Sequence, residues 1–117
     1  MGRFFNNRFN KRVYEEMPHT FTLIDIDGVI VLFNPDGTRL IIIEHKEANE
    51  KIGYMQMKVL KLLDKLIDWN KLDRWSGIYI LRETDYDDIY IFSKIDGSKK
   101  WKISFEQLKK LFTGEIK

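Results

Sequence analysis

The feature that most restricts the fold of this chain is a tight turn between two apolar segments. The turn, NPDGT at 34–38, combines a proline whose backbone angle is preset with Asp-Gly, which tolerates the positive angles of a sharp reversal. Before it, residues 20–33 are β-branched and apolar and are interrupted only by DIDG, and RLIIIEHK (39–46) follows it. Strands joined by so short a turn pair as an antiparallel hairpin.

Helical periodicity appears on both sides of this hairpin. Apolar residues recur at every fourth position between Phe4 and Met17, which predicts a short amphipathic helix that Pro18 ends. Residues from Ala48 to Asn70 carry an apolar stripe at helical spacing, and Gln56 is the one polar residue inside that stripe. We therefore expect a short helix before the hairpin and a long one after it.

The last third of the chain predicts three strands and a closing helix. The strands are expected at 75–82, 88–94 and 99–103, separated by turn-like ETDYD and DGS. Ser104 and Gln107 have the spacing of a helix cap, and this helix should run to about Phe112, before Gly114. The expected fold is thus an α/β (α+β) domain with a mixed sheet and the order αββαβββα.

Composition limits the classes of protein to consider. With 117 residues, of which 44% are hydrophobic, we expect one domain spanning 1–117. The absence of cysteine excludes thiol chemistry and disulfides. The apolar runs are too short to span a membrane, and the N-terminus lacks an apolar stretch with a cleavage site, so we expect a cytoplasmic protein.

The hairpin brings three ionisable side chains together. If Asn34 faces Gly37, counting outward places Asp27 opposite Glu44, and a change in loop length places it opposite Lys46 instead. Glu44 and Lys46 project from one face of their strand because they are two positions apart. Two carboxylates held so close repel one another unless a cation lies between them, and oxygen ligands favour Mg²⁺ or Mn²⁺.

Asp27 with Glu44-His45-Lys46 resembles the signature of the PD-(D/E)XK nucleases, an aspartate on one strand and Glu-X-Lys on the next. The resemblance implies a restriction-endonuclease-like core from residue 4 to about 82, a Mg²⁺-dependent deoxyribonuclease acting as an endonuclease, and a homodimer. It also implies that Gln56 belongs to the site. A glutamate on the first helix, Glu15 or Glu16, would assist the metal.

Two choices within this site stay open. The family's Pro-Asp is replaced by IDIDG, so Asp25 is an alternative to Asp27 as the principal metal ligand. The two aspartates have the same strand parity. The side chain of His45 points away from its neighbours on the strand, so we expect only its backbone carbonyl to act as a metal ligand.

Other functions compete with the nuclease hypothesis. DIDGV resembles the opening motif of the haloacid dehalogenase-like phosphatases, in which Asp25 would be the nucleophile and Asp27 the acid/base. That fold requires a parallel crossover after the first strand, whereas a tight turn follows here. The other alternative is a DNA-binding or interaction module that keeps a nuclease-like fold without turnover.

Basic residues outside the signature are candidate DNA contacts. The net charge of +2 does not by itself indicate a nucleic-acid partner, and such clusters are usually solvated surface. The candidates for nucleic-acid binding are Arg8, Lys11, Arg12, Lys99 and Lys100. Nearby tryptophans suggest a base-stacking surface, with core packing as the alternative. The small, lysine- and isoleucine-rich chain would suit a phage, viral or mobile-element gene, in which case it would act in the host cell.

Overall fold

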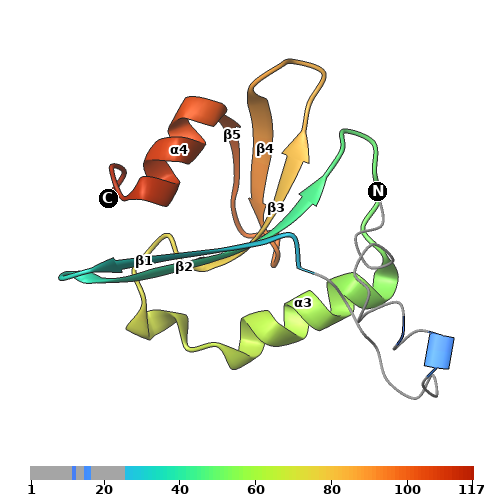
Figure 1. Cartoon of the computed structure of the whole chain (residues 1–117), viewed down its shortest axis with the longest axis horizontal. Coiled ribbons are helices and arrows are strands. Elements are labelled where there is room, and N and C mark those ends of the chain that lie inside the picture. The colour runs from blue at the N-terminus through green and yellow to red at the C-terminus, as the bar shows by residue number, and fades with distance from the viewer. Residues whose placement is uncertain (1–11, 13–14, 17–25) are drawn as a thin grey trace.

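In the part of the chain that the structure describes, two helices pack on a five-stranded mixed sheet in an α+β fold (Figure 1). The computed structural model describes residues 12, 15–16 and 26–117. The strands are β1 (Gly28–Asn34), β2 (Gly37–Lys46), β3 (Gly77–Glu83), β4 (Ile89–Lys94) and β5 (Lys100–Ser104), and the helices are α3 (Tyr54–Leu66), the short 3₁₀ helix η1 (Trp69–Lys71) and α4 (Phe105–Thr113). The described strands follow chain order in the sheet, and among them only β2 and β3 pair in parallel.

The β1–β2 hairpin has the predicted register. Asn34 pairs with Gly37 across the turn, and the pairing continues to Gly28 and Ile43. Gly37 adopts a positive φ of 145°, which favours glycine at this reversal. The first strand is shorter than predicted, because Ile26 and Asp27 lie before it in irregular backbone. Residues 20–25 of the predicted strand lie outside the described residues.

Helix α3 connects the two parallel strands, and it is shorter than the predicted helix from Ala48 to Asn70. Gly53 precedes the helix with extended backbone, and Ile67 at its other end is also extended. Asp68 then starts the separate 3₁₀ turn by accepting a hydrogen bond from the Asn70 N–H. Prediction of one continuous helix was therefore wrong at both ends.

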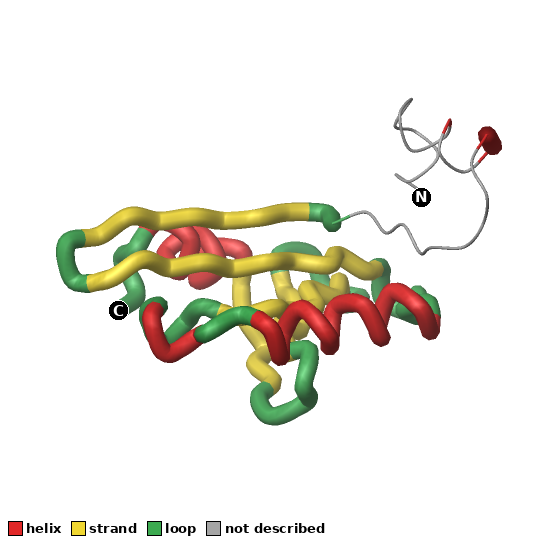
Figure 2. Tube along the Cα trace, turned by 90° about the horizontal axis from the view of Figure 1, so that it is seen from below, coloured by secondary structure: helices red, strands yellow, loops and turns green. Residues whose placement is uncertain are grey.

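The sheet buries an apolar cluster on each face. One cluster, against α4, contains Ile41, Ile43, Tyr79, Phe92, Leu108 and Leu111. The other, against α3, contains Ile42, Leu60, Ile78 and Ile95. Successive residues of β2 alternate between them, which explains its uninterrupted apolar run. Figures 1 and 2 show α3 and α4 on opposite sides of the hairpin strands.

The C-terminal elements agree with the predictions within about two residues at each end. Helix α4 begins with the expected capping box between Ser104 and Gln107, and Gly114 ends it in the left-handed conformation with φ of 86°. Most of the predicted helix from Phe4 to Met17 lies outside the described residues, although Arg12, Glu15 and Glu16 are helical. In the described part of the chain, neither helix has the length and hydropathy needed to cross a membrane.

Candidate functional site

Asp27 lies beside the second strand, where the hairpin register predicts it. The pairing of Gly28 with Ile43 makes Glu44 the next residue opposite Asp27. The Asp27 Oδ2 atom accepts a hydrogen bond from the backbone N–H of His45 at 2.7 Å. The aspartate is thus held against β2 although it precedes the first residue of β1.

Glu44 is buried next to this aspartate, with 4% of its surface exposed. It lies two positions after Ile42 and therefore on the α3 face of the sheet. Burial and the neighbouring Asp27 raise the pKa of the Glu44 carboxyl to about 7, against the opposing effects of a hydrogen bond with Gln56 and the charge of Lys46. Near neutral pH this carboxyl is consequently divided between its protonated and ionised forms.

Lys46 places a buried positive charge between two acidic side chains. Its Nζ atom lies 3.3 Å from Glu44 Oε1 and 3.5 Å from Glu50 Oε2. Glu50 also accepts a hydrogen bond from the backbone N–H of Glu47, and this bond is the main cause that lowers the pKa of the Glu50 carboxyl. The lysine ammonium is therefore fixed in the site instead of extending into solvent.

Helix α3 and β3 complete the surroundings. Gln56 comes from the first turn of α3, is half-buried and interacts with Glu44. Arg82, which pairs with Lys46 across β2 and β3, donates hydrogen bonds from Nη1 to the carbonyls of Glu47 and Glu50. This guanidinium holds the β2–α3 loop in place, and with it the carboxylate that contacts Lys46.

The structure thus brings together four residues that the sequence predicted as one site: Asp27, Glu44, Lys46 and Gln56. Sequence reasoning missed the contributions of Glu50 and Arg82. The position of Glu50 four residues after Lys46 is a weak signal for a contact. No local signal connects Arg82 to residues more than thirty positions earlier in the chain.

The chemistry of this donor set fits a magnesium-type cation. Glu44 Oε2 is buried and has no hydrogen-bond partner within the described residues, so one oxygen of this carboxyl is left for a further partner. Among the same residues no group of three or more acidic or histidine side chains gathers to hold a metal. Mg²⁺ is commonly bound by one or two carboxylates, with water and substrate phosphate as its other ligands.

Protein-family models, curated proteins and solved structures give no match to this chain. The site itself combines a buried carboxyl of raised pKa, a second carboxylate beside it and a fixed ammonium group. Titratable groups with shifted pKa values concentrate at functional sites.

Among the described residues, the other metal ligands that the sequence predicted are not part of this cluster of side chains. Asp25 lies outside the described residues. Glu15 and Glu16 are helical and exposed, and Glu16 pairs with Arg12 at 2.7 Å. The imidazole of His45 lies 3.0 Å from Glu83, so its side chain has a partner on β3, and its carbonyl stays the predicted ligand.

The predicted DNA-binding lysines lie away from this site. Lys99 and Lys100 are exposed at the β4–β5 turn, next to the start of β3, whereas the site lies at the opposite end of β2 and β3. Arg8 and Lys11 lie outside the described residues. The rings of Trp75 and Trp101 are 5.5 Å apart and pack against the α4 cluster, as expected of core residues.

Proposed function

We propose that this protein is a metal-dependent nuclease that hydrolyses phosphodiester bonds in DNA and acts as an endonuclease. The observation that carries the proposal is the convergence of Asp27, Glu44 and Lys46 at the end of the hairpin, with Gln56 supplied by α3. The hairpin, crossover helix and parallel third strand support membership of the PD-(D/E)XK superfamily. The proposed substrate partner is DNA and the proposed cofactor is Mg²⁺ or Mn²⁺.

Asp27 and Glu44, with the His45 carbonyl, would hold the metal. When bound, Mg²⁺ would polarise the phosphate and lower the pKa of a bound water. The N–H of His45 orients the Asp27 carboxylate, and Gln56 contacts that of Glu44. Lys46 would position or help to deprotonate the attacking water and stabilise negative charge on the phosphate oxygens.

The test compares cleavage of plasmid, linear and branched DNA in Mg²⁺ or Mn²⁺ by the wild type and by Glu44→Ala and Lys46→Ala. We expect each substitution to lower the cleavage rate by about 100-fold or more. Glu115→Ala and Lys61→Ala are matched controls, because they remove exposed charges outside the site, from the C-terminal segment and from α3. Equal cleavage by wild type, Glu44→Ala and Lys46→Ala would reject the site.

A DNA-binding or interaction module without turnover is the second candidate. It is favoured by the pairing of Lys46 with Glu44 and Glu50, which compensates the buried charge without a metal. Titration with Mg²⁺ separates the two functions. A metal-induced rise in Tm that Asp27→Ala abolishes supports the enzyme, whereas DNA binding with no response to metal supports the module.

The phosphatase alternative has less support. Its doubly wound core needs a crossover and a parallel neighbour directly after the strand that carries the two aspartates. Here β1 pairs antiparallel with β2 through a tight turn. We therefore do not propose phosphatase activity.

A further inference from the structure

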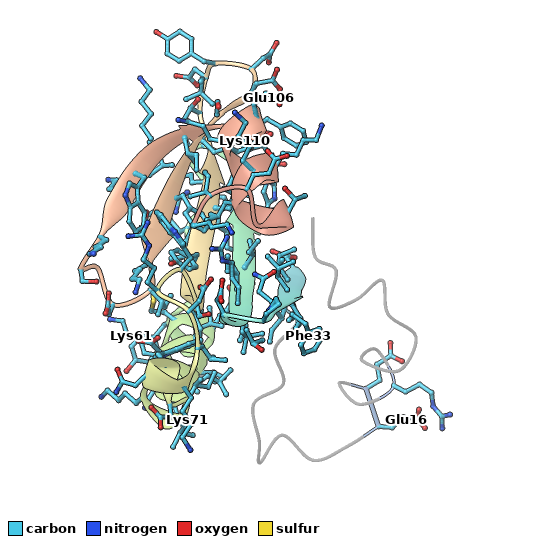
Figure 3. The ribbon with its side chains drawn as sticks, turned by 90° about the vertical axis from the view of Figure 1, so that its left-hand side faces the viewer. Glu16, Phe33, Lys61, Lys71, Glu106 and Lys110 are labelled. Atoms are coloured by element: carbon cyan, nitrogen blue, oxygen red, sulfur yellow. The ribbon has the colours of Figure 1, made fainter. Side chains whose placement is uncertain are left out.

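Strand β1 is an uncharged strand at the margin of the sheet. Its sequence is GVIVLFN, and its described backbone pairing is with β2 on one side only. Val29, Val31 and Phe33 are 53%, 46% and 80% exposed. Figure 2 shows β1 as the outermost strand of the hairpin, and Figure 3 shows Phe33 at the turn end of the molecule.

These three side chains lie on the same face of the sheet as the candidate site. Val29 pairs with Ile42, which belongs to the cluster against α3, and Glu44 is two positions further along β2. The alternate residues of β1 face the other way, where Leu32 lies close to Gly114 at the end of α4. The α4 face of β1 is thus covered, while its α3 face is largely exposed.

Edge strands of monomeric proteins usually carry a charge, a proline or a bulge that prevents pairing with another chain. Strand β1 has none of these between Gly28 and Asn34. Its outer backbone N–H and C=O groups are suited to receive another strand. An uncharged edge also brings no like charges together when it meets a copy of itself.

We propose that two copies of the chain pair through β1, antiparallel to each other, with the two-fold axis at Val31. Of all antiparallel registers, this one pairs all seven residues of the strand with the copy. It places Val31 opposite Val31 of the partner and each Val29 opposite a Phe33, so the exposed apolar side chains become cross-strand neighbours. The two five-stranded sheets then join into one.

For the proposed nuclease, on whose function this step rests, the dimer determines how the two sites are arranged. A two-fold axis perpendicular to a continuous sheet leaves both α3 faces, and hence both sites, on the same side. In this register Asp27 lies opposite residue 35 of the other copy, eight positions from the Asp27 of that copy. The two Asp27 residues are therefore about 27 Å apart along the strand direction. One DNA duplex lying across this side would meet two sites, one for each strand.

The absence of cysteine allows the register to be tested by disulfide formation in the full chain. Val31→Cys introduces one thiol per chain. In the proposed register the two cysteines lie opposite each other across the axis, and the distance between their Cα atoms suits a disulfide. Val29→Cys is the matched control, because its two copies would be about 14 Å apart. We expect mild oxidation to cross-link Val31→Cys at least about 10-fold faster than Val29→Cys, and Val29→Cys/Phe33→Cys to cross-link efficiently.

Sedimentation of the protein without metal or DNA tests the dimer itself. Val31→Lys should raise the dimer dissociation constant by about 100-fold or more, whereas Leu66→Lys, at a 71% exposed position on α3, should leave it unchanged. A monomeric wild type overturns the proposal. This includes the case in which other residues of the same chain cover β1 and shield the cysteine of Val31→Cys from a thiol-reactive label. A dimer that Leu66→Lys dissociates and Val31→Lys does not also overturns it. Because neither measurement involves cleavage, failure of the dimer and failure of the nuclease function are distinguishable.

Discussion

At the scale of single residues, the most informative group is the Glu44 carboxyl. Its burial beside Asp27 disfavours ionisation, and the buried ammonium of Lys46 offsets this only in part. Folding without a bound cation therefore favours the protonated form. A divalent ion favours the ionised form, so protons and metal should compete for this residue.

The first prediction concerns stability against pH in the absence of metal. The pKa of Glu44 is raised from 4.5 to about 7, so the folded state binds more protons than the unfolded state between these values. The free energy of unfolding should consequently fall as pH rises from about 4.5 to 7, by up to roughly 3 kcal/mol. Urea unfolding at closely spaced pH values measures this slope.

Glu44→Gln keeps the size of the side chain and removes its titration. We expect the slope between pH 4.5 and 7 to be reduced in this variant by most of the Glu44 contribution. Glu115→Gln is the control, since it removes an exposed carboxylate from the C-terminal segment, away from the site, and should preserve the slope. An unchanged slope in Glu44→Gln would contradict the assignment of the raised pKa to this carboxyl.

At the scale of elements, the sequence predicts structure where the determinants are local. The register of the hairpin follows from five turn residues and strand alternation, and this was sufficient to place Asp27 beside Glu44. The loop before α3 is bound instead by Arg82 of β3, whose guanidinium donates hydrogen bonds to its carbonyls. Periodicity within the segment does not reveal a contact with a later strand, so the predicted helix began too early, at Ala48, within this loop.

The candidate site shows the same division. Asp27, Glu44 and Lys46 were predictable because strand parity determines which side chains share a face. Gln56 was placed in the site by the family resemblance, since one polar residue in an apolar stripe would equally suit a buried amide that bonds to backbone. Glu50 was not predictable, because its contact with Lys46 requires the loop to turn back after β2. The distant position of Lys99 and Lys100 follows from the β2–α3–β3 crossover, which local charge does not reveal.

The second prediction concerns the attachment of α4 to the hairpin. A Cβ atom on Gly114, which has a φ of 86°, would lie 2.8 Å from Leu32 Cδ2. Gly97 also has a positive φ, of 78°, but a Cβ there would meet nothing within 4 Å. Gly97→Ala should cost about 1 kcal/mol from backbone strain, and Gly114→Ala should cost up to about 1 kcal/mol more, because the end of the Leu32 side chain must shift.

Equilibrium unfolding of these two variants in urea separates the cost of backbone strain from the cost of the steric conflict with Leu32. The difference between them measures the steric conflict between the end of α4 and β1, because both glycines have left-handed backbone. Equal losses of stability would show that the end of the Leu32 side chain moves aside at no cost. That result would contradict the close packing of Gly114 on Leu32.

At the scale of the whole molecule, one strand connects the two halves of the core. Ile41 and Ile43 of β2 belong to the α4 cluster, and Ile42 between them belongs to the α3 cluster. Arg39 of the same strand adds a buried link, since it binds Asp73 at 2.7 Å and the Leu111 carbonyl at 2.6 Å. Neither face can lose its packing without exposing apolar residues of β2.

The third prediction is that both faces unfold in one transition. Trp69 packs against the α3 cluster, whereas Trp75 and Trp101 pack against the α4 cluster. Trp69→Phe therefore leaves reporters on the α4 face, and Trp75→Phe/Trp101→Phe leaves one on the α3 face. In each variant the urea midpoint from fluorescence should equal its own midpoint from far-UV circular dichroism. If the α4-face reporters changed before the dichroism, α4 and its cluster would form a separate unit, and β2 would not couple the site to the rest of the core.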